Sequence, residues 1–406
     1  MIVLFYFDKK TFSYGGINMS VTNIPEKVKI RLWGIAAGRC QYEGCNEPLW
    51  IDTLTQAEFN GAYIAHIIAD SPNGPRGDSI LSEKLERDIT NLMLMCDKHH
   101  RLIDREDLDG HPIERLREMK RKHEQRIKML TSIADSMHSY VLHYGTNIGQ
   151  HNSLVSWEKT TLAMLPLKYP AERPAIEMSL GNSAFYDHEE IFWALEREQL
   201  RRQFSDKVKR RLMLGDVTHL SVFALAPQPL LIELGTLISD ICPADVFQLH
   251  REPTNWIWQE HPQDFEYNII APEKIHNKVA LNLSLSAAID NDRIFSVVGT
   301  DISVWTVTIQ TPNNDYLKSK QQLTMFREIL RKLLNNIKAV HGHNNVLHVF
   351  PAMPVAVAIE LGRIWMSKAD LPLSLYDENR QNGGFKHIFN IGVEFGNAQV
   401  KEISVV

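Results

Sequence analysis

The chain has 406 residues, which at about 150 residues per domain predicts two or three domains. Hydrophobic residues make up 44% and charged residues 23%, a composition that excludes a disordered, collagen-like or disulfide-scaffold chain. The formal net charge of −5 excludes a protein that is basic throughout. Any contact with nucleic acid must therefore come from a local basic patch.

Residues 1–18 are the first predicted segment. They open with a short apolar run that Asp8 ends, and they have neither the basic start nor the cleavage site of a signal peptide. No stretch of the chain reaches the roughly 18 uninterrupted apolar residues of a membrane span. We expect a cytoplasmic protein without membrane contact. Two interpretations of residues 1–18 stay open: an extension ahead of a wrongly assigned start, with Met19 as the true one, or an edge strand.

Residues 19–130 form the first predicted domain and contain three of the four cysteines. Two short-spaced pairs stand out, Cys40 with Cys45 and Cys96 with His99. Zinc prefers four thiolate or imidazole ligands in a tetrahedron, and in a chain without an export signal such pairs favour metal over disulfides. We predict a structural zinc site at these four residues. The alternative is that the cysteines are ordinary buried thiols.

Three further polar residues are interleaved with these pairs in the order His66, Asn91, His100. In this order around a Cys-x2-His pair, the sequence resembles the HNH endonucleases, which have the ββα-metal fold, over about residues 30–128. The resemblance implies cleavage of double-stranded DNA. It implies that His66 is the general base that activates water, and that Asn91 holds the loop carrying His66 through backbone hydrogen bonds.

The same resemblance implies that His100 binds one catalytic divalent cation. Asp104 lies four residues later, on the same helical face, and is the natural second ligand. Many family members carry Asp or His just before the general base, where this chain has Ala65. The cation would then rest on two protein ligands, waters and phosphate oxygens, which suits Mg²⁺. Asp70 is an alternative ligand.

Residues 115–128 are predicted to form a basic helix, with seven Lys or Arg against two Glu. Two interpretations stay open. The helix contacts DNA phosphates beside the site, or it is simply a solvated helix face. Nothing in it resembles a base-reading helix, so we expect little sequence preference.

Residues 131–165 are predicted to be a connector, with a possible strand at 140–143. From residue 166 to residue 406, strand-like runs alternate with helical ones, which predicts βαβ units and a mostly parallel sheet. The predicted strands are 176–180, 220–225, 279–285, 303–309 and 346–350, and the predicted helices are 189–204, 230–239, 318–337 and 355–365.

The C-terminal region repeats itself, because residues 221–238 match residues 348–365 at a constant offset of 127. Each copy is predicted to be a strand, a Pro-containing turn and a helix. Two copies of an α/β subdomain would leave a groove between them, and open α/β sheets bind ligands beyond the carboxyl ends of their strands. The alternative is two packed halves without a ligand. No G-x-G-x-x-G follows a predicted strand, which argues against a dinucleotide cofactor.

Segments 219–235 and 348–379 resemble the SAVED domain, which consists of two fused CARF-like, Rossmann-type halves. The resemblance covers about residues 166–406 and implies a sensor of cyclic oligonucleotide messengers. Together with an HNH domain, it implies an effector nuclease of the bacterial CBASS anti-phage systems. Because each HNH site cuts one strand, we expect a homo-oligomer, a dimer that assembles further on activation.

A cyclic dinucleotide, or a related cyclic oligonucleotide, carries anionic phosphates and flat bases. Its site needs backbone N–H groups at helix starts, cationic or hydroxyl donors, and aromatic surfaces. Loops after the strands, and nearby aromatic or basic residues, are the candidates, with core packing as the alternative for each tryptophan. The candidates are Ser286, Trp256, Trp258, Pro354, Tyr376, Arg380 and Lys386.

The sequence thus predicts an α+β nuclease domain stabilised by zinc and an α/β sensor domain. Its predicted function is metal-dependent DNA cleavage switched on by a cyclic oligonucleotide. One alternative is a modification-dependent HNH restriction endonuclease, against which the internal repeat argues. Another is a ligand-regulated DNA-binding protein without cleavage, against which the intact series His66, Asn91, His100 argues.

Overall fold

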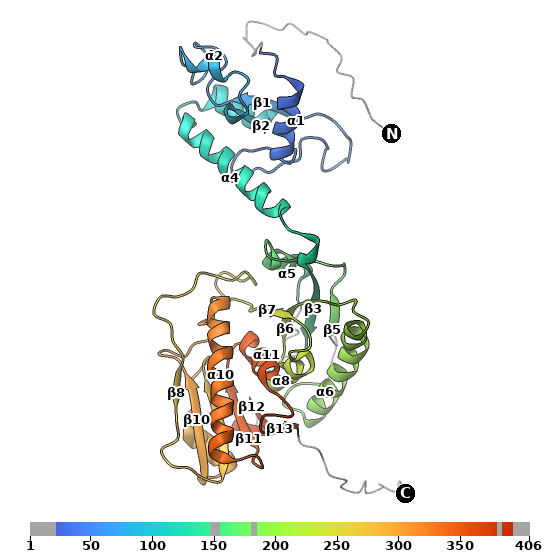
Figure 1. The fold of residues 1–406 in the computed structure, drawn as a ribbon, viewed down its shortest axis with the longest axis vertical. Coiled ribbons are helices and arrows are strands. Elements are labelled where there is room, and N and C mark those ends of the chain that lie inside the picture. The colour runs from blue at the N-terminus through green and yellow to red at the C-terminus, as the bar shows by residue number, and fades with distance from the viewer. Residues whose placement is uncertain (1–21, 147–154, 180–184, 380–383, 393–406) are drawn as a thin grey trace. The chain divides into compact units, whose positions relative to one another are not determined.

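The structure is a computed structural model that describes residues 22–146, 155–179, 185–379 and 384–392 (Figure 1). The chain divides into two compact units, Met1–Ile133 and Ala134–Val406. The predicted extension or edge strand at residues 1–18 lies outside the described residues. Among the helices described, none is both long enough and apolar enough to span a membrane.

The first unit is built on a two-stranded antiparallel sheet followed directly by a helix. Strand β2 carries the sequence LMLMC and is buried along its whole length, while β1 buries only its last two residues. The register pairs His66, the last residue of β1, with Leu92 at the start of β2. The elements are α1 (Glu26–Ile35), β1 (Ala62–His66), α2 (Leu81–Leu85), η1 (Ile89–Asn91), β2 (Leu92–Cys96), α3 (Asp97–Arg101), η2 (Leu102–Glu106) and α4 (Ile113–Thr131).

Apolar side chains from the flanking helices cover this small sheet. Leu32 of α1 and Leu116 and Met119 of α4 are buried in one cluster with the β2 residues. Both helices therefore dock through a narrow apolar stripe, as expected for helices that are otherwise highly polar.

The first half of the second unit is a parallel sheet in the order β5-β3-β6-β7, with β4 also pairing with β3. Its strands are β3 (His138–Gly145), β4 (Tyr169–Pro170), β5 (Ile176–Ser179), β6 (Leu220–Leu225) and β7 (Ala244–Val246). Its helices are η3 (Asp135–Met137), α5 (Trp157–Met164), α6 (Glu190–Phe204), η4 (Ser205–Lys209), α7 (Arg210–Met213) and α8 (Gln228–Ile238).

The predicted connector at 131–165 requires a correction. Strand β3 pairs with three other strands and is buried along most of its length. The second unit therefore begins near residue 134, about 30 residues before the predicted boundary at 166. The strand expected at 140–143 is the middle of β3.

The second half is a larger sheet in the order β13-β12-β11-β9-β10-β8. The four central strands are parallel, and antiparallel strands close both edges. The elements are β8 (Asn268–Ile270), β9 (Lys278–Ser284), α9 (Asn291–Val298), β10 (Ile302–Thr308), α10 (Lys320–His341), β11 (Leu347–Ala352), α11 (Val355–Ile364), β12 (Leu373–Asn379) and β13 (Gly384–Ile391).

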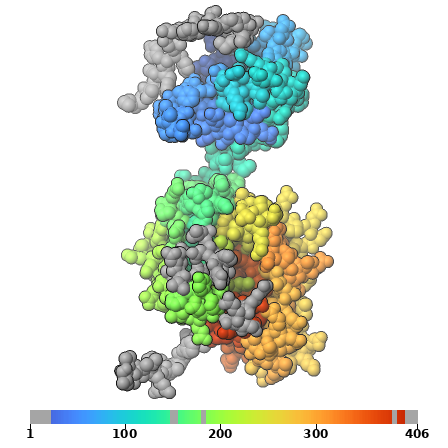
Figure 2. Space-filling view, turned by 180° about the vertical axis from the view of Figure 1, so that it is seen from behind, coloured from blue at the N-terminus to red at the C-terminus, as the bar shows by residue number. Residues whose placement is uncertain are grey.

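The two halves repeat one topology, since the order β5-β3-β6-β7 corresponds to β10-β9-β11-β12. The repeated segments are β6–α8 and β11–α11, and the two helices pack side by side at the centre of the unit (Figure 1). In the space-filling view the green first half lies beside the yellow-to-red second half (Figure 2). The alternating strands and helices predicted from residue 176 onward are confirmed as a mixed α/β fold.

The repeated Glu-Leu-Gly tripeptides lie where α8 and α11 cross. A β-carbon added at Gly235 would lie 2.0 Å from the carbonyl oxygen of Ile359, and one added at Gly362 would lie 2.0 Å from that of Ile232. The two helix backbones are therefore in direct contact, which only glycine permits. The repeat in the sequence reflects a helix crossing in the fold.

Candidate functional site

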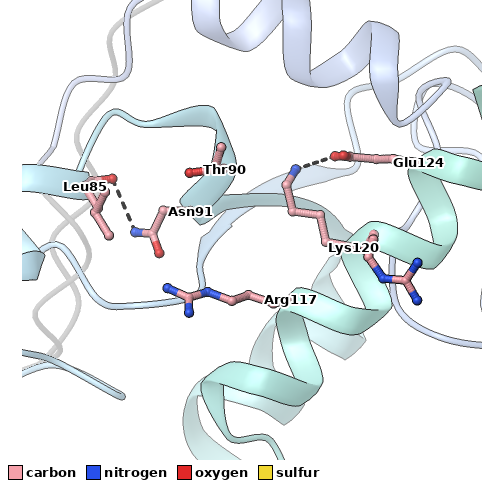
Figure 3. Close-up of a pocket in the computed structure, with 7 residues that line it drawn as sticks. Leu85, Thr90, Asn91, Arg117, Lys120 and Glu124 are labelled. Carbon is pink, nitrogen blue, oxygen red and sulfur yellow. Dashed lines mark hydrogen bonds and ion pairs between the residues drawn. The ribbon is translucent and has the colours of Figure 1, made fainter.

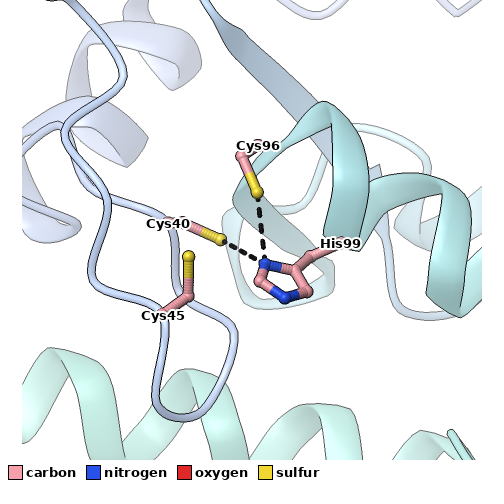
Figure 4. Close-up of side chains that lie close together, drawn as sticks. All are labelled: Cys40, Cys45, Cys96 and His99. Carbon is pink, nitrogen blue, oxygen red and sulfur yellow. Dashed lines mark hydrogen bonds between the residues drawn. The ribbon is translucent and has the colours of Figure 1, made fainter. Parts of the chain in front are cut away.

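Four side chains from two segments of the first unit form a compact cluster (Figure 4). The ligand atoms of Cys40, Cys45, Cys96 and His99 all lie within 4.8 Å of one another. His99 Nδ1 is 3.7 Å from Cys40 Sγ and 3.2 Å from Cys96 Sγ. Neighbouring ligands on a tetrahedral zinc are about 3.6–3.8 Å apart, so the cluster has the donors and the dimensions of a zinc site.

Residues around the cluster hold the His99 ring in place. The ring of Tyr42 stacks on that of His99 with centroids 4.1 Å apart and parallel planes. The hydroxyl of Tyr42 is 3.0 Å from Nε2 of His111, whose Nδ1 is 2.6 Å from the carbonyl oxygen of Asp107. His111 therefore donates through Nδ1 and accepts the Tyr42 hydroxyl proton at Nε2. The stacked ring of Tyr42, itself bonded to His111, restricts rotation of the His99 ring.

Burial shifts the pKa values of three cluster residues. It raises the pKa of the Cys40 and Cys96 thiols and lowers the pKa of His99. A neutral imidazole is the form that binds metal, whereas the thiols need a cation beside them to ionise.

His66 lies at the end of β1 and is 8% exposed. Its Nε2 is 2.9 Å from the carbonyl oxygen of Glu86. A carbonyl only accepts, so Nε2 carries the proton and Nδ1 of the neutral ring keeps its lone pair. Nδ1 makes no hydrogen bond with any residue that the structure describes.

Asn91 fixes the backbone immediately after His66. Its side-chain Oδ1 accepts from the Ile68 N–H at 2.8 Å, and its Nδ2 donates to the Ile68 carbonyl at 2.8 Å. The backbone N–H of Ile67 also donates to the Asn91 carbonyl at 2.8 Å. Asn91 is 3% exposed, so these bonds are shielded from water.

His100 and Asp104 form a second polar pair, on α3 and the π-helical turn η2 that follows it. His100 Nε2 is 3.4 Å from Asp104 Oδ2. Two cis ligands of one Mg²⁺ are about 3 Å apart, so the pair fits a shared cation. Burial lowers the pKa of His100 while Asp104 opposes that shift, and the ring of His66 is close enough to lower it further.

Two further residues were considered for the cation site, Ala65 and Asp70, and the structure shows the surroundings of both. Ala65 is 1% exposed and faces the core, so this position offers no ligand. Asp70 accepts a hydrogen bond from Thr22 Oγ1 at 2.8 Å.

A pocket of about 420 Å³ lies between helix α4 and the turn that carries Asn91 (Figure 3). Lys120 forms an ion pair with Glu124, and Arg121 forms one with Glu118. Arg117 is exposed and points into the pocket beside Asn91 without a partner among the described residues. The lining residues are Leu85, Thr90, Asn91, Arg117, Lys120, Arg121 and Glu124.

In the second unit, two of the predicted ligand-binding residues lie at one edge, where parallel strands of the two halves end. The backbone N–H of Ser286, after β9, donates to the Ala352 carbonyl at the end of β11. Pro354 follows two residues later and precedes α11. Gln228, at the start of α8, accepts the Met353 N–H through its side-chain oxygen at 3.2 Å.

The structure corrects the predicted stacking surfaces. Trp256 is 2% exposed and packs edge-on against Phe223, and Tyr376 is 5% exposed and stacks on Phe350. Neither ring has an open face for a nucleobase, because both faces are occupied by the core. Trp258 is half-buried against Phe247.

The structure says less about the remaining two predicted ligand-binding residues. Lys386 is exposed on β13, opposite Asp377 of β12. Arg380 lies outside the described residues.

Sequence reasoning missed several residues that support these sites. Tyr42 and His111 orient a cluster ligand, and Arg76 binds the backbone beside His66. None belongs to a spaced motif, since each acts through contacts that only folding creates. The positive φ of Arg76 is likewise invisible in the sequence.

Residues 197–391 match the family model of the "SMODS-associated and fused to various effectors sensor domain", SAVED. The C-terminal part of the chain therefore contains a SAVED sensor domain, and the match includes α8, α11 and the crossing between them. The search of curated proteins finds no match.

Three solved structures illustrate the similarity of the chain to Cap4 SAVED/CARF-domain containing receptors. The Acinetobacter baumannii receptor with 2′3′3′-cAAA is 13% identical with a TM-score of 0.40, over 68% of this chain and 56% of that chain. The same receptor with 3′3′3′-cAAA is 11% identical with a TM-score of 0.41, over 68% and 60%. The Moraxella osloensis receptor is 14% identical with a TM-score of 0.38, over 68% and 54%. The chain thus spans less than two thirds of the length of each.

Proposed function

We propose that the protein is a metal-dependent endonuclease of the HNH type whose activity is controlled by a SAVED domain that senses a cyclic oligonucleotide. The surroundings of the His66 side chain are the observation that supports the nuclease part of this proposal. Its Nδ1 makes no hydrogen bond within the described part of the chain, its ring is fixed by the Glu86 carbonyl, and it lies close to the His100–Asp104 pair.

In this proposal His66 acts as the general base. A water molecule in line with the scissile phosphorus would lose its proton to Nδ1, while the Nε2 proton stays on the bond to Glu86. Asn91 keeps the loop after His66 from moving during this transfer, through its three backbone bonds.

His100 and Asp104 would hold the catalytic Mg²⁺ or another divalent cation. When bound, such a cation polarises the phosphate and stabilises the departing 3′ oxygen. Cys40, Cys45, Cys96 and His99 would hold a structural zinc that connects the Cys40–Cys45 loop to α3, and α3 carries His100.

Helix α4 is the proposed contact for duplex DNA. Three of its cations, Lys120, Arg121 and Lys122, form ion pairs with glutamates, and Arg117 remains available at the pocket beside Asn91. A phosphate contact there would position the backbone of either DNA strand without reading bases.

The SAVED domain supports the sensing part of the proposal. The ligand class follows from the family resemblance, and anti-phage defence of the CBASS type is the corresponding biological role. Ser286, Pro354 and Gln228 mark the edge shared by the two halves, where parallel strands end and helices α8 and α11 begin, and open α/β sheets bind ligands at such an edge.

A plasmid assay tests the proposal. Full-length protein is incubated with supercoiled plasmid, Mg²⁺ and a panel of cyclic di- and trinucleotides, with His66→Ala as the inactive variant. We expect cleavage with at least one panel member and a loss of 10²-fold or more in His66→Ala, because general-base catalysis is typically worth about 10²–10⁴ in rate.

The exposed His343 gives the matched control, because His343→Ala removes an imidazole far from the proposed site in sequence. A His66→Ala variant within about threefold of the parent protein would refute the general-base assignment. DNA binding without cleavage under all conditions would instead favour a regulator.

A further inference from the structure

Arg76 connects the two segments that carry the proposed nuclease residues, and its side chain is only 7% exposed. Nε donates to the carbonyl of Ile67 at 2.8 Å, and Nη2 is 3.4 Å from the carbonyl of His66. On the other side, Nη1 donates to the Ile103 carbonyl at 2.6 Å and Nη2 to Asp104 Oδ1 at 2.5 Å.

The backbone around Arg76 is unusual. Its φ of +55° lies in the left-handed region, which a non-glycine residue adopts only when the surroundings enforce it. Gly77 follows, where an added β-carbon would lie 2.4 Å from the Pro72 carbonyl oxygen. The tight turn over residues 71–77 therefore directs the guanidinium inward at an energetic cost.

The bonds of Arg76 also select an orientation for Asp104. With Oδ1 held by the guanidinium, Oδ2 is the oxygen that faces His100 Nε2. The same guanidinium holds the end of β1, where His66 lies. One side chain thus sets both the spacing of the two segments and the rotation of a proposed ligand.

Electrostatics excludes the simplest alternative, that Arg76 strengthens cation binding. A positive charge beside Asp104 repels a divalent cation and weakens the attraction of the carboxylate for it. Any benefit of Arg76 to a metal-dependent reaction must therefore come from geometry.

We propose that Arg76 is a positioning residue, which holds His66 at a fixed distance from the His100–Asp104 pair so that base and cation act on the same phosphate. This inference rests on the proposed nuclease function. A planar guanidinium suits the role because its fork can bond to acceptors on two segments at once, which a lysine ammonium cannot do in the same geometry.

The test compares full-length Arg76→Lys and Arg76→Gln with the parent protein. The control is Arg101→Gln, which removes an exposed arginine of α3 that is 3.9 Å from Asp97. Zinc content and thermal unfolding establish that each protein is folded, and Arg76→Lys serves if Arg76→Gln does not fold. Amide hydrogen exchange and Mn²⁺ affinity, the latter by electron paramagnetic resonance, are measured first. Plasmid cleavage is then measured at saturating Mn²⁺, in the presence of cyclic di-AMP, cyclic di-GMP, cyclic GMP-AMP or cyclic tri-adenylate.

For both Arg76 variants we expect faster exchange in residues 66–70 and 101–106, and parent-like exchange in the Cys40–Cys45 loop. Mn²⁺ affinity should be unchanged or higher. At saturating Mn²⁺, kcat should fall about 10–100-fold, the size of effect that a displacement near 1 Å produces, while KM stays within about threefold. Arg101→Gln should match the parent protein in exchange.

Three results would overturn the inference: full kcat in Arg76→Lys, recovery of kcat by additional Mn²⁺, or parent-like exchange in Arg76→Gln. The first would show that charge alone matters, and the second that Arg76 acts through metal affinity. If the parent protein cleaves no DNA, the nuclease proposal fails, and the exchange data still decide whether Arg76 holds the two segments together.

Discussion

One backbone carbonyl decides which nitrogen of His66 can act as a base. Because the Glu86 carbonyl accepts the Nε2 proton, Nδ1 is left with the lone pair. The residue type alone could not determine this, since a free histidine exchanges between the two tautomers. The proposed chemistry therefore depends on a contact between residues 20 positions apart.

The Cys/His cluster yields a prediction about metal content. Cys45→Ser should lose zinc and destabilise the first unit, because zinc binding and folding are coupled in such sites. Zinc stoichiometry by mass spectrometry under non-denaturing conditions, together with thermal unfolding, measures both effects.

Cys242→Ser is the matched control, since Cys242 is a buried free thiol outside the cluster. It should retain all bound zinc. A parent protein that contains no zinc after purification without chelators would contradict the assignment.

His143 gives a prediction about acid stability. Burial lowers its pKa to about 4, and its Nε2 bonds to Thr160 Oγ1 at 2.9 Å while Nδ1 has no hydrogen-bond partner among the residues that the structure describes. The unfolded chain, with a histidine pKa near 6.5, takes up the proton first as the pH falls. The free energy of unfolding should therefore fall by about 3 kcal/mol between pH 6.5 and 4, and His143 should contribute no pH dependence above that range.

Urea unfolding of the parent protein and of His143→Gln between pH 4 and 7 measures this contribution. The variant should lack that part of the slope, whereas the exposed-site variant His343→Gln should keep it. Identical slopes in all three proteins would show that His143 is not the responsible group.

At the scale of elements, the crossing of α8 and α11 is the feature on which the second unit depends. Two buried glutamates flank it: Glu233 pairs with Arg197 and Arg201 of α6, and Glu360 pairs with Arg327 of α10 and with Arg363. The helices that cover the two sheets are thereby connected to the crossing through charge pairs. Substituting one partner of such a pair would leave the other charge buried without compensation, which destabilises the fold.

Gly235→Ala and Gly362→Ala should each destabilise the second unit by about 1–3 kcal/mol or more. In an ordinary helix the same change stabilises by roughly 0.5–1 kcal/mol, so the sign is reversed by the contact. The reason is that the added methyl group would overlap a backbone carbonyl, which cannot rotate away.

Thermal unfolding monitored by circular dichroism measures the effect. Gly34→Ala is the control, because Gly34 lies in α1 with open space around its α-carbon, and it should stabilise the first unit slightly. A neutral result at both crossing glycines would mean that the helices separate more easily than the contact implies.

For the whole molecule, the proposed combination of nuclease and sensor predicts that the protein is nearly inactive without a ligand. A ligand shifts an equilibrium only through its different affinity for the two states, and a shift from 1:99 to 99:1 needs about 5.5 kcal/mol. Enclosure between two α/β halves, together with a new contact between subunits, would supply an energy of this size.

Cleavage and light scattering, each with and without the members of the cyclic nucleotide panel, test this prediction. We expect both activity and mass to rise with the same panel member. Full activity without any cyclic nucleotide, and a constant mass after its addition, would contradict control by the SAVED domain.

Patterns in the sequence were sufficient to predict much of this protein. The spacing of Cys40, Cys45, Cys96 and His99 predicted residues that lie together, and the alternating runs after residue 176 predicted the α/β strands and helices closely. Both signals are local, since short-spaced ligands and hydrophobic periodicity depend on neighbours along the chain.

Other features depend on contacts between distant segments, and only the tertiary structure decides them. Strand β3 was not predicted as part of the sheet because its partners lie 30 to 80 residues away. Trp256 and Tyr376 were candidate stacking surfaces, with core packing as the alternative for the tryptophan, because burial has no local signature in the sequence. The hydrogen bonds of Arg76 to two separate segments, and the close approach of Gly235 to the Ile359 carbonyl, are likewise determined by packing. Side-chain chemistry identifies which residues can form a site, whereas packing determines which of them face each other and which face the core.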